Sequence, residues 1–297
     1  MKKKWTQDDI PDQAGRIAIV TGANTGIGYE AARALAHKGA VVILACRSRE
    51  KGEAAVARIA SERPRGRVSF AALDLSDLES VRRFADEFKK THDRLDLLVN
   101  NAGVMVPPES RTRQGFELQF GVNHLGHFAL TNALLDLLRA TPGARVVSVA
   151  SAAHRFGKME FDDLDFTARG YDPWAAYGQS KLANLLFTFE LQRRLEAEGA
   201  DIIAAAAHPG WTGTDLQRNA WYMRLLNHVF AMPPVQGALP TLRAATDPDV
   251  RGGDYYGPHG IREMRGYPVR VGTTDAAKSE EDAARLWQVS EELTRAR

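Results

Sequence analysis

The sequence predicts a doubly wound α/β fold, in which a mainly parallel sheet of seven strands carries helices on both faces. Three observations predict it. Short apolar segments alternate six times with segments of helical periodicity. The apolar segments lack the polar alternation of half-exposed strands, as expected where both faces of a sheet are covered. A glycine-rich turn joins the first strand to the first helix.

The composition is ordinary for a globular protein, and the lack of a linker, a low-complexity tract or an internal repeat predicts a single domain over residues 1–297. The chain has 39 basic and 37 acidic side chains, a net charge of +2. The three lysines at positions 2–4 supply more than this excess, so the rest of the chain is nearly neutral. We therefore expect no basic face for nucleic acid. Cys46 is the only cysteine, which favours a reducing, cytoplasmic compartment. The longest uncharged stretch, 118–135, contains polar side chains, so no integral membrane segment is expected.

The strand segments are rich in β-branched and other apolar residues. The first reads R-I-A-I-V-T and the second V-V-I-L-A-C, and each is followed by a turn and a helical segment. Right-handed crossovers between such strands place helices on both faces. We can locate six of the seven strands, at 16–21, 41–46, 67–73, 95–99, 144–150 and 201–207.

Capping residues delimit the first three helices. The first helix continues from the glycine-rich turn and ends at Gly39. Ser48 is predicted to cap a second helix over 49–63. Ser76 is predicted to cap the third helix, with Glu79 in the capping-box position.

The second half of the chain contains two long helices and two long loops. Apolar residues at helical spacing predict helices over 115–139 and 174–199. The loops, at about 152–173 and 211–234, both follow strand ends, and the second has the pattern of a lid helix. Ligands of open α/β sheets bind at the carboxyl ends of the strands, so we expect both loops to form the substrate site.

The turn after the first strand has the properties of a phosphate-binding loop. Its glycines follow the spacing G-x-x-x-G-x-G, which allows a tight turn, close approach of a pyrophosphate and close packing of the helix. A purely structural turn is the alternative. Cofactor contacts are expected here from Gly22, Asn24, Thr25, Gly26, Ile27 and Gly28.

The end of the second strand indicates which dinucleotide binds. From the start of the second strand no acid occurs before Glu50, whereas Arg47 and Ser48 could hold the 2′-phosphate of NADP. A solvated arginine at the start of the second helix is the alternative. We predict a preference for NADP(H), with NAD(H) as the second candidate.

Tyr177 and Lys181 form a candidate catalytic pair. Their spacing of four residues places them on one helix face. A nearby ammonium stabilises a phenolate, so Lys181 is expected to lower the pKa of Tyr177. Taken alone, the same spacing is typical of an ordinary surface pair.

Together these motifs resemble the short-chain dehydrogenase/reductase family, which has a Rossmann-type fold. The resembling elements are T-G-A-N-T-G-I-G, Asn100-Asn101-Ala102-Gly103, Asn123, Ser151, Tyr177-x-x-x-Lys181 and Pro209-Gly210, in that order over nearly the whole chain. The sequences G-V-N-H-L-G-H-F and H-P-G-W-T-G-T-D-L are most similar to the branch of retinol dehydrogenases and WW-domain oxidoreductases.

The resemblance implies a role for each matching residue. Tyr177 would be the general acid or base, Lys181 would lower its pKa and hold the nicotinamide ribose, and Ser151 would bind the substrate oxygen. Asn123 would hold a water that relays protons. Further cofactor contacts would come from Asp74, Leu75, Asn101, Ala102, Gly103, Pro209, Gly210, Thr212 and Thr214.

These expectations define an NADP(H)-dependent oxidoreductase that transfers hydride between nicotinamide and a carbonyl or alcohol carbon. Aromatic residues in the two loops favour an apolar substrate resembling a retinoid, a steroid or an aliphatic aldehyde, with packing of the loops themselves as the alternative. The alternative function is a non-catalytic NADP(H)-binding sensor.

Three further features bear on partners and metals. Segment 182–189 is apolar nearly all round, which suits a homodimer or homotetramer or else a larger internal core. No metal is expected, because His124 and His127 lack further ligands. His154 would either pack within its loop or line the substrate pocket.

Overall fold

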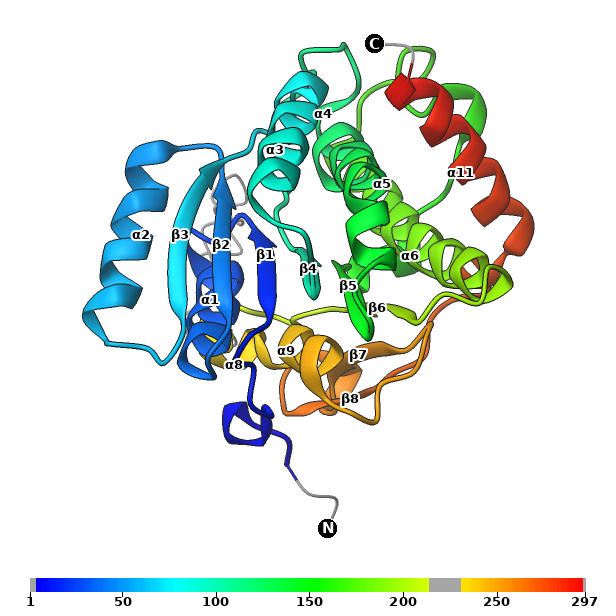
Figure 1. Ribbon diagram of the computed structural model, residues 1–297. Coiled ribbons are helices and arrows are strands. Elements are labelled where there is room, and N and C mark those ends of the chain that lie inside the picture. The colour runs from blue at the N-terminus through cyan, green and yellow to red at the C-terminus, as the bar shows by residue number, and fades with distance from the viewer. Residues whose placement is uncertain (1–3, 214–230, 296–297) are drawn as a thin grey trace.

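The computed structural model describes residues 4–213 and 231–295 and contains one continuous sheet (Figure 1). Its strand order is β3-β2-β1-β4-β5-β6-β7-β8, and only the β7–β8 pairing is antiparallel among these strands. The predicted doubly wound α/β class is confirmed, but the predicted number of strands is one too low. The strands are β1 (Ile17–Thr21), β2 (Val41–Cys46), β3 (Arg67–Ala72), β4 (Leu97–Asn100), β5 (Ala144–Val149), β6 (Ile202–Ala207), β7 (Tyr255–Pro258) and β8 (Pro268–Arg270).

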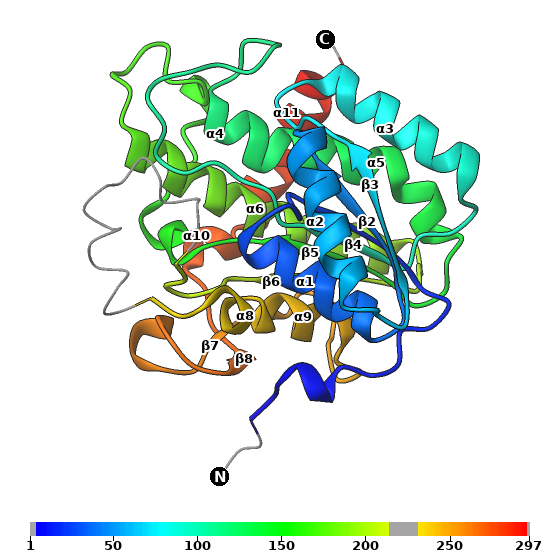
Figure 2. The ribbon, with the colours of Figure 1, turned by 90° about the vertical axis from the view of Figure 1, so that its left-hand side faces the viewer.

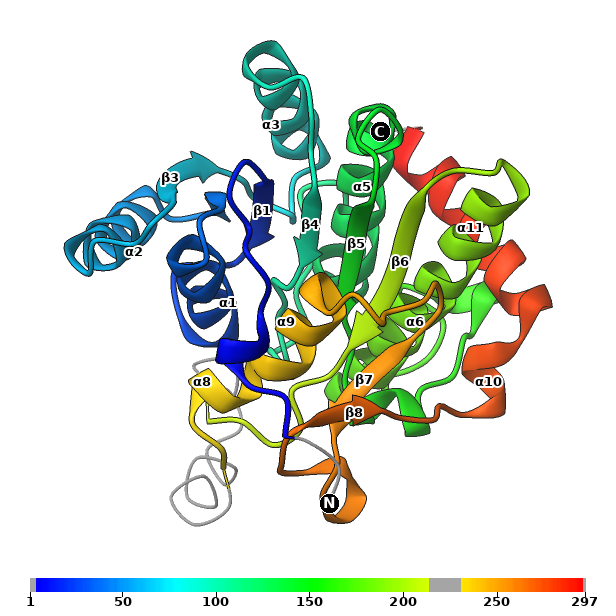
Figure 3. The ribbon, with the colours of Figure 1, turned by 60° about the horizontal axis from the view of Figure 1, so that its bottom comes forward.

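Helices cover both faces of the sheet (Figures 2 and 3). Helices α1, α2 and α9 pack on one face, and α3, α5 and α6 on the other, where α11 covers α5 and α6. The helices of the described residues are α1 (Gly26–His37), α2 (Arg49–Ser61), α3 (Leu78–Thr91), α4 (Leu118–Phe120), α5 (Gly126–Arg139), α6 (Pro173–Ala197), α8 (Pro234–Gly237), α9 (Leu239–Thr246), α10 (Asp275–Lys278) and α11 (Glu280–Arg295). No helix within these residues is long and apolar enough to cross a bilayer.

Strand β1 illustrates why the strand segments are apolar at successive positions. Ala18 and Val20 enter the core on the face of α1, and Ile19 enters the core on the opposite face. All three side chains are fully buried. A strand buried on both faces has no position for a polar side chain, which explains the absence of alternation in the sequence.

The first three helices have the predicted order, but one cap differs. Gly39 has a φ of +104°, and the Ser48 side chain accepts a hydrogen bond from the Lys51 amide, as predicted. The predicted cap at Ser76 is wrong. Asp77 caps α3 by accepting from the Glu79 amide at 3.1 Å, because its carboxylate is a stronger acceptor than the neighbouring hydroxyl.

The predicted helix over 115–139 begins later and is interrupted. Gly115 has a φ of +89°, which no right-handed helix contains, and the helix starts at Leu118. The Glu117 carboxylate caps it by accepting from two backbone amides. A π-helical segment, Gly121–Leu125, then joins α4 to α5 and carries Asn123.

The apolar surface of α6 is covered within the same chain. The Phe187 ring stacks on Trp287 of α11 at 5.9 Å, and Phe128 of α5 meets Trp287 edge-on at 5.0 Å between ring centroids. The apolar segment of α6 therefore serves a larger internal core, the second of the two explanations offered by the sequence.

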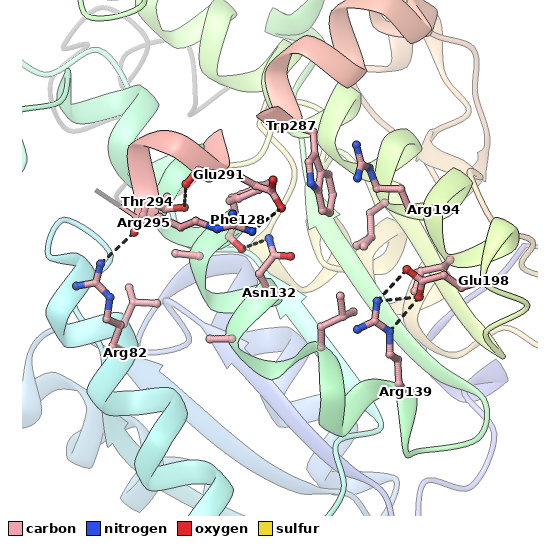
Figure 4. Close-up of a pocket in the computed structure, with 16 residues that line it drawn as sticks. Arg82, Phe128, Asn132, Arg139, Arg194, Glu198, Trp287, Glu291, Thr294 and Arg295 are labelled. Carbon is pink, nitrogen blue, oxygen red and sulfur yellow. Dashed lines mark hydrogen bonds and ion pairs between the residues drawn. The ribbon is translucent and has the colours of Figure 1, made fainter. Parts of the chain in front are cut away.

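A groove of about 490 Å³, lined in part by Phe128 and Trp287, lies between α3, α5, α6 and α11 (Figure 4). Its rim contains arginines that are already engaged. Arg139 pairs with Glu198 at 2.7 Å, and Arg194 lies 4.4 Å over the Trp287 ring. The candidate catalytic residues do not line this groove.

Candidate active site

The carboxyl ends of β4 and β5 bring the four candidate catalytic residues together. Ser151 follows β5 and hydrogen-bonds to Tyr177 of α6. A Cβ placed on Gly103, after β4, would lie 3.1 Å from Asn123 Oδ1 and 3.7 Å from Lys181 Nζ. Residues separated by up to 78 positions in the sequence thus meet at one edge of the sheet.

Tyr177 lies in apolar surroundings. Its side chain is buried against Met105, Val106 and Ala153, with Trp174 packed beside it. Burial raises the pKa of Tyr177 to about 12, and the hydrogen bond with Ser151 opposes this rise. The direction is opposite to the lowering expected from Lys181.

Lys181 is directed mainly at a backbone carbonyl. Its Nζ donates to the Val149 oxygen at 3.0 Å and lies 5.8 Å from the centroid of the Tyr177 ring. Burial lowers the pKa of Lys181 to about 8. Desolvation dominates both groups, because the helix places the pair inside the protein rather than at its surface.

Asn123 fixes the chain segment that follows β4. Its Oδ1 accepts from the Val104 amide at 2.8 Å, and its Nδ2 donates to the Val104 carbonyl and to Ser180 Oγ. Both amide hydrogens are therefore used within the protein. This structural role is additional to the expected water-holding role and has no local sequence signal.

His154 fixes the backbone of Ser151. Its Nδ1 donates to the Ser151 carbonyl at 2.7 Å, and its Nε2 accepts from Thr273 Oγ1 at 3.1 Å. The ring is 1% exposed, and burial lowers its pKa. Of the two sequence interpretations, packing within the loop is the one that these contacts support.

The glycine-rich turn has the conformation that its glycines permit. Gly22 and Gly26 have φ values of +66° and +59°, in the left-handed region. A Cβ on Gly28 would lie 2.4 Å from Asn101 Nδ2, so this glycine permits close packing against the segment after β4. Asn101 in turn donates to the Thr21 carbonyl at 2.8 Å.

A buried thiol supports the same turn. Cys46 Sγ accepts hydrogen bonds from the amides of Ala23 and Asn24, while burial raises its pKa to about 11. The thiol therefore holds the end of β2 against the glycine-rich turn. In the sequence, Cys46 indicates only a compartment, because nothing local to residue 46 identifies these partners.

The residues expected at the adenine side are divided between surface and core. Arg47 is exposed at the end of β2, and within residues 4–213 and 231–295 no ion pair engages it. Ser48 is partly occupied as the cap of α2. The Asp74 carboxylate accepts from Ser76, and Leu75 is buried against Gly126.

The Pro209–Gly210 turn is held from two sides. Gly210 has a φ of +65°, and a Cβ there would lie 2.6 Å from the Met264 oxygen. Thr212 Oγ1 donates to the Pro209 carbonyl at 2.9 Å. Thr214 and most of the predicted lid helix lie outside the described residues.

The aromatic residues of the first loop serve two purposes. Phe166 packs on Tyr171, whereas Phe156 and Trp174 form a wall that continues to Tyr177. Phe156 is 52% exposed, so this wall has an open apolar face. Asp163 caps its own loop by accepting from three backbone amides.

The paired histidines have ordinary core partners. His124 Nε2 lies 2.7 Å from Ser290 Oγ, and His127 Nε2 lies 2.9 Å from Thr21 Oγ1. Burial lowers the pKa of His124 to about 3 and that of His127 to about 4. In the described part of the chain, no three His, Cys, Asp or Glu side chains converge as metal ligands.

Comparison with known proteins identifies related sequences and structures. Residues 16–224 match the short chain dehydrogenase family. The chain is 43% identical over 284 residues to retinol dehydrogenase 12 of Mus musculus, covering 94% of this chain and 86% of that protein.

Two solved structures extend this similarity to the fold. An uncharacterised protein of Mycobacterium paratuberculosis is 46% identical, with a TM-score of 0.84 over 99% of this chain and 98% of that one. The NADP complex of Pseudomonas aeruginosa RhlG is 27% identical, with a TM-score of 0.64 over 82% of this chain and 94% of that one.

Proposed function

The chain belongs to the short-chain dehydrogenase family, in the branch of the retinol dehydrogenases, and is an oxidoreductase acting on CH–OH groups; we propose that it uses NADP(H) and reduces an apolar aldehyde or ketone. The observation that carries this proposal is the convergence of Ser151, Tyr177, Lys181 and Asn123 beside the glycine-rich turn.

The residues around the turn fit a dinucleotide. Gly22 and Gly26 adopt left-handed conformations, and the turn leads into the first backbone amides of α1, which favour binding of an anion. Arg47 places an exposed guanidinium group at the end of β2, where it could bind a phosphate with two hydrogen bonds. The RhlG complex supports NADP as the bound form in this family. Bound nicotinamide would donate the hydride in reduction and accept it in oxidation.

Proton transfer is assigned to Tyr177. Because burial raises its pKa to about 12, the phenol is protonated at neutral pH and is ready to donate to the oxygen of a carbonyl substrate. Ser151 would hydrogen-bond the same oxygen and stabilise its developing charge. Reduction of a carbonyl requires this protonated form.

Replenishment of that proton is assigned to Lys181. A pKa near 8 lets this side chain exchange protons close to physiological pH. Its Nζ lies beside Gly103 and Asn123, where we propose that a water held by Asn123 completes the relay.

The apolar substrate is supported by the wall of Phe156 and Trp174 next to Tyr177. The name of retinol dehydrogenase 12 is consistent with a substrate of this class. Long-chain aldehydes should therefore have lower KM values than short polar ones of equal reactivity.

Tyr177→Phe provides the test. It removes the proton donor and keeps the ring, so turnover should fall roughly 10²- to 10⁴-fold while the affinity for NADPH stays the same. NADPH fluorescence measures binding, and loss of absorbance with retinoid, steroid and aliphatic carbonyls measures turnover. Wild-type binding without turnover of any of them would support the sensor alternative, and near-normal activity of the variant would refute the mechanism.

Two further expectations are also proposals. A cytoplasmic location is supported by Cys46, a single buried thiol that needs no disulfide partner. A homodimer or homotetramer would need a contact surface away from the segment of α6 that α11 covers. Cell fractionation and light scattering, respectively, test them.

A further inference from the structure

One carboxylate connects three segments that surround the candidate active site. Glu263 Oε1 accepts from Arg155 Nη2 at 2.7 Å, and Glu263 Oε2 accepts from His208 Nε2 at 2.9 Å. Arg155 belongs to the 3-10 helix that follows Ser151, His208 follows β6, and Glu263 lies between β7 and β8. Glu263 therefore joins chain segments that are 55 and 108 residues away from it.

The Arg155 side of this bridge leads to Ser151. Residues 152–156 form a single 3-10 helix, capped by the Ser151 side chain, which accepts from the Ala153 amide at 3.2 Å. The preceding residue, His154, already binds the Ser151 carbonyl. A displacement of Arg155 would therefore shift this short helix and, with it, Ser151, the residue expected to bind the substrate oxygen.

The His208 side leads to the Pro209–Gly210 turn. His208 Nδ1 accepts from the Gly210 amide at 3.3 Å, so this nitrogen carries no proton and Nε2 is the donor to Glu263. The Met264 carbonyl, next to Glu263, accepts from the Trp211 amide at 2.8 Å. The segment between β7 and β8 therefore holds the Pro209–Gly210 turn twice, through the Glu263 carboxylate and through the Met264 carbonyl.

Charge and burial suit a fixed bridge. His208 is 1% exposed, and its ring packs at 5.3 Å from Tyr255. The hydrogen bond from His208, together with the Arg155 charge, lowers the pKa of Glu263 and keeps it ionised. The Glu263 side chain is 20% exposed, so solvent screens the pair with Arg155 only in part.

The backbone that carries Glu263 is strained. Arg262 and Glu263 have φ values of +52° and +56°, a left-handed conformation that residues with a Cβ seldom adopt. Hydrogen bonds from the Glu263 amide to Gly260 and from the Gly260 amide to Arg265 hold this shape. Strain that the surrounding structure maintains is found preferentially at functional sites.

We propose that Glu263 is a positioning residue that sets the Ser151 helix and the Pro209–Gly210 turn in register with each other. It acts through Arg155 and His208, and it lies beyond residues 16–224, the part that matches the family. The inference rests on the proposed function, in which Ser151 serves the substrate and the turn serves NADP(H).

Three substitutions separate the two arms of the bridge. Arg155→Gln should lower kcat roughly ten- to hundredfold with an unchanged Kd for NADPH, since small displacements at the reacting atoms have effects of this size. His208→Leu should raise the Kd for NADPH with a smaller effect on kcat. Glu263→Gln should lower kcat and raise the Kd for NADPH. As a conservative control, Arg155→Lys should retain most of the kcat that Arg155→Gln loses.

Glu198→Gln is the matched control, because Glu198 pairs with Arg139 at 2.7 Å on a distant face of the protein. It should leave both constants within twofold of wild type. The proposal would be overturned if Glu263→Gln had near-normal kcat and Kd. It would also be overturned if kcat and affinity fell in parallel in all three variants, in proportion to the folded fraction measured by circular dichroism. Absence of wild-type turnover would instead refute the proposed function, and NADPH binding would still test the His208 arm.

Discussion

Replacing Lys181 by methionine should make the protein more stable while stopping turnover. Lys181 is 3% exposed, and its ammonium has one hydrogen-bond acceptor within the described residues, the Val149 carbonyl. Burial therefore disfavours the charged form in the folded chain and lowers its pKa from 10.5 to about 8. Methionine fills a similar volume without the charge.

The size of the effect follows from that pKa. At pH 7 the lowered pKa corresponds to about 3 kcal/mol of destabilisation, since each tenfold change in proton affinity is worth about 1.4 kcal/mol. Loss of the hydrogen bond to the Val149 carbonyl costs the variant about 1 kcal/mol of this gain in stability. Asn184 Nδ2 still donates to the same carbonyl at 3.2 Å. Lys181→Met should therefore stabilise the fold by about 2 kcal/mol at pH 7.

The pH dependence has a definite sign. Between the folded pKa near 8 and the unfolded value of 10.5, the unfolded chain binds more protons at this position, so wild-type stability rises with pH relative to the variant. Guanidinium denaturation of both proteins from pH 7 to 10 should show the advantage of Lys181→Met shrinking steadily above pH 8. A difference that is constant over this range, or a variant less stable at pH 7, would refute the reasoning.

Three other substitutions test separate features. Arg47→Asp should lower the ratio of NADPH to NADH turnover roughly tenfold or more, since it replaces a charged donor with a repelling acid; an unchanged ratio would remove Arg47 from the cofactor site. Asp77→Ala should cost about 1 kcal/mol in the free energy of unfolding through loss of the α3 cap, measured by urea denaturation, and a larger loss in Ser76→Ala would contradict the cap assignment. Trp287→Ala should cost about 3 to 5 kcal/mol by emptying the aromatic contact of α11 with Phe128 and Phe187, and a cost under 1 kcal/mol would show that α11 is not an integral part of the core.

The sequence predicted the fold because its central strands, β1, β2, β4, β5 and β6, are buried on both faces. Continuous apolar runs such as 41–46 are typical of strands covered on both faces, and the left-handed conformations of Gly22 and Gly26 are local requirements of the turn. Gly28 is different, because the close approach of Asn101 requires it. β8 has three residues, too few to form a pattern. The π-helical segment around Asn123 was likewise not predicted, because it shifts the helical repeat of apolar residues by only one position.

The site was harder to predict wherever a property depends on distant segments. Spacing placed Tyr177 and Lys181 on one face, but the direction of the Tyr177 pKa follows from its burial. Part of the apolar cluster that buries it, Met105 and Val106, comes from the distant loop after β4. Glu263 had no local indication at all, because its partner Arg155 lies 108 residues earlier.

The position of α11 after α6 in the sequence has a consequence for biosynthesis. Residues 280–295 are synthesised well after α6, so Phe187 and its apolar neighbours on α6 remain uncovered until α11 has left the ribosome. Exposed surface of this kind recruits holding chaperones and favours aggregation. A premature stop before residue 280 should therefore yield an insoluble polypeptide even though the cofactor turn, Tyr177 and Lys181 have all been synthesised.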